Sequence, residues 1–384
     1  MDMLTTLHTS AHQLGAIPDG TVQAVITSPP YYGLRSYAGE QDIKWPSVTY
    51  RLNEWCEPVT VQGCEPGCAH EWVTYAQKRG SGGEREYGSY DSGVGRGPAV
   101  KHPGHNFCPH CGGWRGPLGL EPSPVAYIGH LILCLREWRR VLRDDGVCFV
   151  NLGDSYAGSG GAGGDYNGGG IREGQPRWKS QFRAGATVKP KDLLGIPWMF
   201  AFAARADGWY LRSDIIWAKP NPMPESVTDR PTKSHEYVFL LAKSPRYFWD
   251  AEAVREDKAL STVGDPRTNG NGHRRDRDYT GAPSNGGTNL GGPEGGRNIR
   301  TVWNIATSPY PGAHYAVFPE RLVEPMVKAG SKPGDMVLDP FAGSGTTGRV
   351  AIRLGRRAIL CDVSAEYLTD HVPDRTTVQM ELLA

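Results

Sequence analysis

The segment from Asp339 to Thr347, which reads Asp-Pro-Phe-Ala-Gly-Ser-Gly-Thr-Thr, constrains the fold of this 384-residue chain more than any other part of the sequence. It follows a short apolar run at residues 336–338 and precedes an amphipathic segment at residues 348–354. We therefore expect a strand, a glycine turn and the start of a helix. Glycines in such a turn let the backbone approach a ligand closely, and the exposed N–H groups at the helix start suit polar or anionic groups.

This turn is typical of a nucleoside site rather than of a triphosphate site. The lysine that a phosphate-binding P-loop needs after its last glycine is absent, because Thr346 follows Gly345. Asp362 lies 23 positions after Asp339, at the end of a second apolar run, and a carboxylate there can accept both hydroxyls of a ribose. We expect a cofactor that carries a nucleoside, bound to an α/β sheet. A plain strand–turn–helix connection is the alternative.

A second motif follows the strand expected at residues 22–26, where residues 27–33 read Thr-Ser-Pro-Pro-Tyr-Tyr-Gly. Pro29 and Pro30 restrict the backbone to extended conformations and remove two N–H donors, so the carbonyl groups before them stay free to accept hydrogen bonds. The ring of Tyr31 then lies beside the Ser28 hydroxyl and an unpaired carbonyl, at the carboxyl end of a strand. Such a cluster can hold a planar group that carries an amine.

Ser-Pro-Pro-Tyr, followed far downstream by Asp-Pro-Phe-Ala-Gly-Ser-Gly-Thr-Thr, resembles the exocyclic-amino DNA methyltransferases that use S-adenosylmethionine. The order, with the target-base motif first and the cofactor motif last, is that of the family's beta group. The resemblance implies an α/β fold with a Rossmann-like, seven-stranded and mostly parallel sheet, an antiparallel hairpin at its edge, and a circularly permuted order of motifs. We expect glycine-rich loops and a zinc-knuckle insertion to interrupt this fold.

The resemblance also implies the roles of individual residues. The substrate would be double-stranded DNA with a flipped target base, since an amine in a stacked duplex cannot be reached. In the family the first strand usually ends in Gly-Asp near the cofactor's adenine, whereas this chain has Thr9-Ser10. The residues expected to act on the target base are Ser28, Pro29, Pro30 and Tyr31. Those expected to bind the cofactor are Asp339, Pro340, Phe341, Ala342, Gly343, Ser344, Gly345, Thr346, Thr347, Asp362, Phe318 and Pro319.

The choice of target atom follows from the same motif. Methylation at cytosine C5 needs a nucleophilic cysteine after a proline, and the sequence contains no Pro-Cys pair, which excludes that reaction. Family members with serine ahead of Pro-Pro-Tyr lean towards cytosine N4 and those with aspartate towards adenine N6, so Ser28 favours cytosine N4. Adenine N6 is the alternative. A non-catalytic, zinc-containing DNA-binding module and a methyltransferase that acts on RNA or on protein glutamine also remain open.

Residues 43–117 interrupt the expected catalytic framework with two pairs of cysteines. Three residues separate Cys64 from Cys68, and two separate Cys108 from Cys111. Thiolates at these spacings resemble a structural zinc knuckle, four-coordinate and closed to substrate; free thiols in a loosely held insert are the alternative. We expect no hydrophobic core to hold this insert, so a metal ion would do so. Spare candidates for ligands are Cys56, His70 and His110.

The formal net charge is only +1, so a surface for nucleic acid must come from local segregation of charge. Trp178 and Phe182 lie in a stretch, residues 171–191, whose only acidic residue is Glu173. We expect this stretch to face DNA, because cations follow phosphates and aromatic rings stack on unpaired bases. Residues 256–300 would form the target-recognition region. The cations of the first stretch are Arg172, Arg177, Lys179, Arg183, Lys189 and Lys191.

Composition suggests the setting of the protein. Eight cysteines, several in close pairs, fit a reducing compartment. There is no signal peptide, and no apolar run reaches the ~18 residues of a membrane-spanning helix. We expect a cytoplasmic restriction-modification enzyme, associated with the nucleoid or encoded by a phage in a bacterial host, with an unknown partner nuclease. The expected divisions are a catalytic domain in three parts, residues 1–42, 118–255 and 301–384, a zinc-binding insertion, residues 43–117, and the target-recognition region, residues 256–300.

Overall fold

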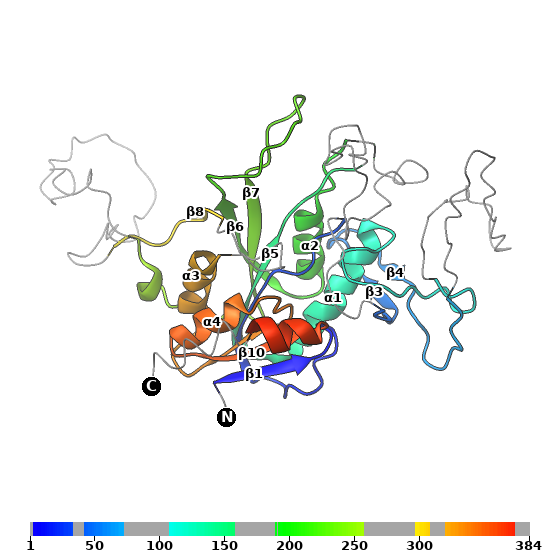
Figure 1. Ribbon diagram of the computed structural model, residues 1–384, viewed down its shortest axis with the longest axis horizontal. Helices are drawn as coiled ribbons and strands as arrows, with labels where there is room; N and C mark the ends of the chain where they lie inside the picture. The colour runs from blue at the N-terminus through cyan, green and yellow to red at the C-terminus, as the bar shows by residue number, and fades with distance from the viewer. Residues whose placement is uncertain are drawn as a thin grey trace, which may run out of the picture.

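The computed structural model describes residues 3–33, 42–72, 107–157, 189, 191–256, 296–307 and 319–372. Within these ranges the chain forms an eight-stranded sheet with helices on both faces, and a separate two-stranded sheet (Figure 1). This is the α/β architecture that the glycine turn predicts. The strands of the large sheet are β1 Leu4–His8, β2 Val22–Thr27, β5 Leu142–Leu152, β6 Tyr210–Ala218, β7 His235–Ala242, β8 Val302–Asn304, β9 Met336–Asp339 and β10 Arg357–Asp362.

The strands follow the order β1-β10-β9-β2-β5-β7-β6-β8. The first five run parallel to their neighbours, whereas β7 runs antiparallel to both β5 and β6. The mostly parallel sheet and its antiparallel hairpin are therefore confirmed. The sheet has eight strands rather than the expected seven, because the three-residue strand β8 pairs in parallel with the end of β6 and buries Trp303 there.

Alternating side chains give the sheet two apolar faces. In β5, Cys148 and Val150 belong to one core cluster, and Val147 and Phe149 belong to the other. A strand that is covered on both faces is apolar on both sides, which explains the nearly continuous apolar runs in the sequence. Helices α1 and α2 cover the first face and α3 and α4 the second (Figure 1). The helices span α1 Pro124–Val141, α2 Ile196–Ala206, α3 Glu320–Gly330 and α4 Thr346–Arg353.

Local backbone conformation sets where α2 begins. The sequence predicts a helix over residues 191–206, but α2 starts at Ile196. Lys191 and Gly195 have positive φ angles of 73° and 72°, which a right-handed helix does not contain. The carboxylate of Asp154 accepts the N–H groups of Gly195 and Ile196 at 3.0 and 3.1 Å. Asp154 is therefore a helix-capping residue.

Apolar side chains anchor the described part of the insertion to the catalytic domain. Its two strands, β3 Val48–Tyr50 and β4 Val59–Val61, form an antiparallel hairpin. The hairpin packs against α1 at Gly129, where an added Cβ would lie 3.0 Å from side chains of both strands. Trp45 and Trp114 are buried in the same core cluster as α1. The expectation that no hydrophobic core holds the insertion is therefore wrong for these residues.

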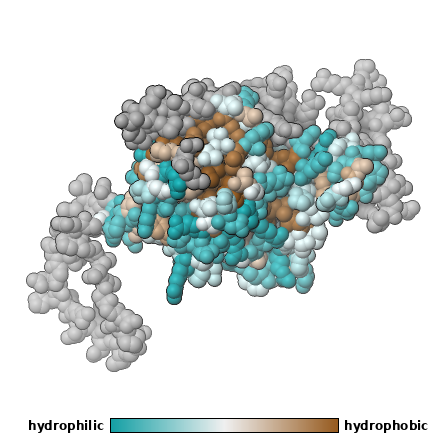
Figure 2. Space-filling view, turned by 90° about the horizontal axis from the view of Figure 1, so that it is seen from below, coloured by the Kyte–Doolittle hydropathy of each residue, from teal (hydrophilic) through white to brown (hydrophobic). Residues whose placement is uncertain are grey.

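The surface of the molecule includes an apolar area. Seen from below, it is mostly hydrophilic around an apolar area in the middle of that face (Figure 2). Among the described residues, no helix has both the length and the hydrophobicity that a membrane crossing requires. The loop between β6 and β7, residues 219–234, projects beyond the sheet (Figure 1).

Candidate active site and metal centre

The two sequence motifs meet at the carboxyl ends of neighbouring strands. β2, which ends just before Ser28, pairs in parallel with β9, which ends at Asp339. The Thr27 hydroxyl donates a hydrogen bond to Asp339 Oδ1 at 2.7 Å, although the two residues are 312 positions apart. The Ser-Pro-Pro-Tyr segment and the glycine turn are therefore adjacent, at the edge where open α/β sheets bind their ligands.

Asp339 is a buried structural carboxylate. Thr347 donates to its Oδ2 at 2.7 Å, and the backbone N–H of Phe341 donates to Oδ1 at 3.1 Å. Burial raises the pKa of Asp339 to about 6, while the hydrogen bonds from Thr27 and Thr347 oppose that rise. These donors come from β2 and from the turn itself. Asp339 thus fixes the position of the glycine turn relative to the target-base motif.

Two glycines shape the turn between β9 and α4. Gly343 and Gly345 have φ angles of 49° and 76°, a region that glycine enters without steric cost. The N–H of Gly343 donates to Asp362 Oδ2 at 2.9 Å, which ties the turn to the end of β10. The N–H of Ala342 donates to the Cys361 carbonyl at 2.9 Å. The turn therefore has a fixed place between the ends of two parallel strands.

Asp362 lies where the cofactor's nucleoside is expected. Its carboxylate accepts backbone N–H groups of Gly343, Ser364 and Val363. Burial raises the pKa of this carboxyl group, and these hydrogen bonds oppose the rise. A carboxylate offers about four acceptor positions, so capacity remains for a ribose hydroxyl. The donors and acceptors at this point fit a nucleoside cofactor.

The other residues expected at the cofactor site are only partly described. Pro319 is buried and precedes the first residue of α3, whereas Phe318 lies outside the described residues. Where the family usually has Gly-Asp, the Thr9 hydroxyl donates to the Gln13 carbonyl at 2.8 Å. The Ser10 hydroxyl lies 2.7 Å from Nδ1 of His12. Both hydroxyls are thus bonded within the protein.

The Tyr31 hydroxyl is the centre of a polar network at the target-base motif. It donates to Glu236 Oε2 at 2.6 Å and lies 2.9 Å from Asn151 Oδ1. The Ser28 hydroxyl donates to it at 3.3 Å. Asn151 lies near the end of β5, and Glu236 near the start of β7. Because β7 is antiparallel, its first residues reach the same edge of the sheet as the ends of β2 and β5.

Sequence reasoning did not identify Asn151 or Glu236 as site residues. Asn151 could have been noticed, because it is a polar residue near the end of an otherwise apolar strand. No local pattern marks Glu236, which lies 205 positions after its partner Tyr31. Lys219, which is paired with Glu236, was missed for the same reason.

The backbone of the target-base motif is held from α1 and from the segment that connects the insertion to α1. Tyr127 of α1 donates to the Pro30 carbonyl at 2.8 Å. The N–H of Gly33 donates to the Gly119 carbonyl, also at 2.8 Å. At Gly153, an added Cβ would lie 2.7 Å from the ring of Tyr31, so only glycine lets the ring lie against this strand end.

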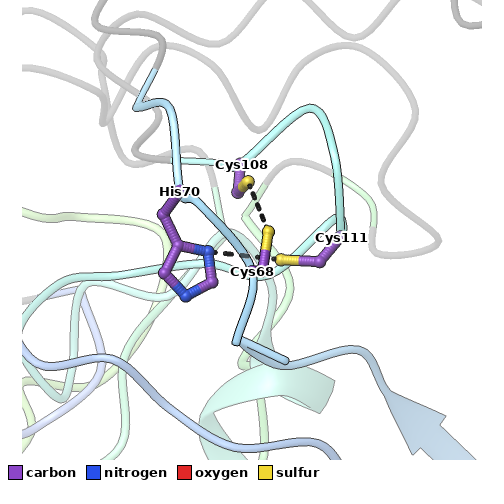
Figure 3. A group of neighbouring side chains, drawn as sticks. All are labelled: Cys68, His70, Cys108 and Cys111. Atoms are coloured by element: carbon purple, nitrogen blue, oxygen red, sulfur yellow. Dashed lines mark hydrogen bonds between the residues drawn. The ribbon is translucent and has the colours of Figure 1, made fainter. Parts of the chain in front are cut away.

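Four side chains of the insertion form a second site. The ligand atoms of Cys68, His70, Cys108 and Cys111 all lie within 4.8 Å of one another (Figure 3). Two sulfur atoms, on Cys68 and Cys108, are 3.8 Å apart, and Cys111 Sγ lies 3.5 Å from His70 Nδ1. A tetrahedral zinc ion, with bonds of about 2.3 Å to sulfur and about 2.1 Å to nitrogen, would hold such atoms about 3.8 and about 3.6 Å apart. Both distances fit zinc.

This group differs from the predicted set of ligands in one residue. Cys64 is not among the four residues, and its place is taken by His70, one of the spare candidates. The N–H of Cys64 is bound to the Trp45 carbonyl at 2.7 Å, and its thiol donates to the Trp114 carbonyl at 3.5 Å. Cys64 is therefore held against the core. A turn closed by the hydrogen bond from Cys68 N–H to the Glu65 carbonyl then presents the following residues to the site.

The environment of Cys108 favours a thiolate. Burial raises the pKa of this thiol, but hydrogen bonds from the backbone N–H of Cys111, from His70 and from the backbone N–H of His110 outweigh burial and lower the pKa to about 5. Since the thiolate is the form that binds metal ions, this residue is suited to be a ligand. His110 itself faces Glu71 at 3.4 Å instead of joining the group.

Comparison with known proteins agrees with this geometry. Residues 22–372 match the family model described as DNA methylase, of the N6/N4 type. The chain belongs to this family. It is a DNA methyltransferase that depends on S-adenosylmethionine, as its two motifs predict.

Several curated relatives and solved structures resemble this member of the DNA methylase family. It is 44% identical over 258 residues to the type II methyltransferase M.Cfr9I of Citrobacter freundii. The aligned residues make up 65% of this chain and 72% of the relative. The chain is 34% identical over 363 residues to M.XycI of Xanthomonas campestris pv. cyanopsidis, covering 93% and 82%. The solved PvuII cytosine-N4-specific methyltransferase is 15% identical with a TM-score of 0.47, covering 99% of this chain and 94% of that one.

Proposed function

We propose that the protein methylates the exocyclic N4 amine of cytosine at a specific site in double-stranded DNA. The observation that supports this choice is Ser28, whose hydroxyl donates to the Tyr31 hydroxyl at 3.3 Å beside the cofactor turn. A serine ahead of Pro-Pro-Tyr is the form of the motif that leans towards cytosine in this family. Relatives named type II methyltransferases support a site-specific enzyme. Adenine N6 is the alternative target.

The residues of the target-base motif have different roles in binding the target base. The Ser28 hydroxyl and the Pro29 carbonyl accept hydrogen bonds from the target amine, since the Pro30 carbonyl is already bound by Tyr127. These bonds favour a pyramidal nitrogen whose lone pair is aimed at the cofactor. Tyr31 stacks on the base after the base has left the helix. Positioning of this kind supplies on the order of several kcal/mol of the rate enhancement.

The cofactor is held at the ends of β9 and β10. The backbone of residues 340–346 would surround it, and Asp362 would accept a hydrogen bond from a ribose hydroxyl. Phe318 and Pro319 close over its methionine end. S-adenosylmethionine, when bound, supplies an activated methyl group on a sulfonium.

Two substitutions test these roles. Ser28→Ala and Tyr31→Ala should each lower the rate of methyl transfer by about 100-fold or more, because the amine and the base are no longer oriented. The dissociation constant of S-adenosylmethionine, measured by calorimetry, should change less than about threefold, since neither side chain belongs to the glycine turn. Tyr210→Ala, at the opposite end of the sheet, is the control and should keep wild-type activity. Full activity of both test variants would contradict the proposal.

The target atom can be measured directly. Mass analysis of nucleosides from DNA methylated by the purified enzyme should show N4-methylcytosine. N6-methyladenine in its place would assign the alternative target and leave the enzyme class unchanged.

The relatives also support a biological setting. We place the protein in the bacterial cytoplasm, bound to the nucleoid or encoded by a phage, as the modification enzyme of a type II restriction-modification system. Its partner would be double-stranded DNA that carries the recognition sequence. Protection of that DNA from a nuclease of the same specificity is the test of this setting.

We further propose that Cys68, His70, Cys108 and Cys111 bind a structural zinc ion. Two separations, Cys68 Sγ to Cys108 Sγ and Cys111 Sγ to His70 Nδ1, are those of a tetrahedral site, and all four ligand atoms lie within 4.8 Å of one another. Four protein ligands leave no open position for a substrate, which is the pattern of structural rather than catalytic zinc. The ion would secure the end of the insertion, where the chain enters and leaves residues 73–106.

Metal content separates this ligand set from the one that includes Cys64. Wild-type protein and Cys64→Ser should each contain about one zinc ion per chain, and Cys68→Ser and His70→Ala well under half of that. Cys64→Ser is the matched control, because it removes a neighbouring thiol that lies outside the group. Full zinc content in Cys68→Ser, or loss of zinc in Cys64→Ser alone, would contradict the assignment.

A further inference from the structure

A chain of hydrogen bonds leads from the target-base motif to a carboxylate on another strand. Ser28 Oγ donates to Tyr31 Oη at 3.3 Å, and Tyr31 Oη donates to Glu236 Oε2 at 2.6 Å. The two bonds point in the same direction along the chain. This is the arrangement that a proton relay needs, since each hydroxyl can accept a proton on one side as it releases its own on the other.

Glu236 is the favoured acceptor of the Tyr31 proton. The hydroxyl has one proton and two acceptors within reach, Asn151 Oδ1 at 2.9 Å and Glu236 Oε2 at 2.6 Å. The bond to the carboxylate is shorter, and a bond to a charged acceptor is about twice as strong as a neutral one. Lys219 binds the other oxygen, Oε1, so Oε2 is the atom that faces Tyr31. The Glu236 side chain is only 14% exposed.

Other carboxylates at this edge of the sheet have different tasks. Asp339 is bound by two threonines and joins β2 to the glycine turn. Asp154 caps α2, and Asp362 binds backbone N–H groups at the end of β10. Among these carboxylates, Glu236 is the one that is hydrogen-bonded to Tyr31 of the target-base motif.

The reaction releases a proton that needs an acceptor. As the target amine is methylated, the nitrogen lone pair forms the new N–C bond while the C–S bond of the donor breaks and its electron pair stays on sulfur. The nitrogen then carries a positive charge, which is neutralised when one N–H proton leaves. Removal of that proton during the transfer favours the forward reaction, because it stops charge from accumulating on an aromatic amine.

We propose that Glu236 takes up this proton through Ser28 and Tyr31. The amine proton passes to Ser28 Oγ, the Ser28 proton to Tyr31 Oη, and the Tyr31 proton to Glu236 Oε2. The products are a neutral methylated base, two restored hydroxyls and a protonated Glu236. This inference rests on the proposed roles of Ser28 and Tyr31, but it applies to cytosine and adenine alike, since both amines lose one proton. Glu236 does not touch the target base and acts through Tyr31 and Ser28.

Glu236→Gln tests the relay, because glutamine keeps the shape of the side chain and one carbonyl oxygen, available to either Tyr31 or Lys219, but does not take up the proton. The single-turnover rate of methyl transfer, with DNA and S-adenosylmethionine saturating, should fall by about 100-fold or more. The dissociation constants of both ligands should change less than about threefold. Fluorescence of 2-aminopurine at the target position, which reports rotation of the base out of the helix, should stay at the wild-type level.

Glu236→Ala provides a second test, rescue by an added carboxylate. Formate should fill the space left by the side chain and raise the single-turnover rate by about tenfold or more, in proportion to its concentration. The matched control is Glu252→Ala, which removes a glutamate that is 73% exposed and paired with Arg255. It should keep the wild-type rate and show no response to formate.

The outcomes separate the relay from the rest of the mechanism. A Glu236→Gln rate within about fivefold of wild type, or a folded Glu236→Ala protein that formate does not rescue, would overturn the relay. A parallel loss of rate and of the 2-aminopurine response would also overturn it, because Glu236 would then only hold Tyr31 in place. If Ser28→Ala and Tyr31→Ala are inactive while Glu236→Gln keeps its rate, the proposed function stands and the relay alone fails.

Discussion

Residues of one motif have opposite orientations in this site. Asp339, the first residue of the glycine motif, is turned into the protein, where Thr27 and Thr347 bind its two oxygens. In the proposed function, the following turn residues and Asp362 would contact the cofactor. A motif read from the sequence therefore combines residues that join strands with residues that contact ligands, and only the contacts of each side chain separate the two.

Ionisation of Asp339 should make the stability of the folded protein depend on pH. Burial raises its pKa to about 6 in the folded protein, above the ~3.9 of an unfolded chain. The folded state therefore binds more protons between these values. The stability that this group contributes is present at low pH and is lost as the pH rises through about 6, by about 2 kcal/mol between pH ~4.5 and pH ~7.

Asp339→Asn removes this dependence, because the amide has the same shape and does not ionise. The free energy of unfolding of the variant relative to wild type, measured with urea, should rise by about 2 kcal/mol over that pH range. A constant difference between the two proteins would show that Asp339 is ionised to the same extent in the folded and unfolded states.

At the scale of elements, the connection between the insertion and α1 supports the target-base motif. Glu121 is fully buried and accepts the N–H of Gly119 at 2.8 Å and a hydrogen bond from His130 Nδ1 at 2.9 Å. The His130 ring is stacked on Trp45, with centroids 4.3 Å apart and a 9° angle, and its centroid lies 5.7 Å from that of Trp114. Trp45 and Trp114 of the insertion thus contact α1 at His130, the residue that is hydrogen-bonded to Glu121.

Substitution of Glu121 should destabilise the folded protein. Glu121→Ala leaves the Gly119 N–H and the His130 ring without a partner in a buried place, so it should lower the free energy of unfolding by about 3–5 kcal/mol. Glu252→Ala, which removes an exposed ion pair, should leave the free energy of unfolding close to the wild-type value. If both variants change the free energy of unfolding by the same amount in chemical denaturation, the buried pair of Glu121 and His130 does not stabilise the fold more than an exposed ion pair does.

At the scale of the whole molecule, the sheet brings both motifs and the start of the antiparallel hairpin to one edge. DNA must approach that edge, yet the net charge of +1 supplies little attraction. The cations of residues 171–191 would supply it locally. Lys189 lies 3.8 Å from Asp192 and Lys191 lies 2.6 Å from Asp229. The other four cations of this stretch lie outside the described residues.

Neutralising those four cations, Arg172, Arg177, Lys179 and Arg183, should weaken DNA binding. A plot of the logarithm of the DNA association constant against the logarithm of the salt concentration should have a shallower slope. Each phosphate that the protein no longer neutralises lowers the slope by about 0.9, so the loss of four cations lowers it by up to roughly 3.6. The affinity for S-adenosylmethionine should not change. The control is Lys328→Gln with Lys332→Gln, at the opposite edge of the sheet. An unchanged salt slope in the fourfold variant would mean that DNA lies elsewhere.

Short-range patterns in the sequence were enough to predict several of the elements and the family. Apolar runs bounded by glycine and proline located β2, β9 and α4, and the two motifs indicated the class of reaction. These features depend on neighbouring residues, so they can be recognised without knowing how the chain packs. The order of the motifs determined the permuted fold in the same way.

The tertiary structure alone decided which side chains complete the two sites. Glu236 reaches Tyr31 from 205 positions away because β7 runs antiparallel to its neighbour. His70, and not Cys64, lies in the group with Cys68, Cys108 and Cys111, since Cys64 is bound to the carbonyl groups of Trp45 and Trp114. Contacts of this kind depend on strand pairing and on packing between distant segments. Residue type and spacing along the chain do not contain that information, which is why these partners appear only in the folded protein.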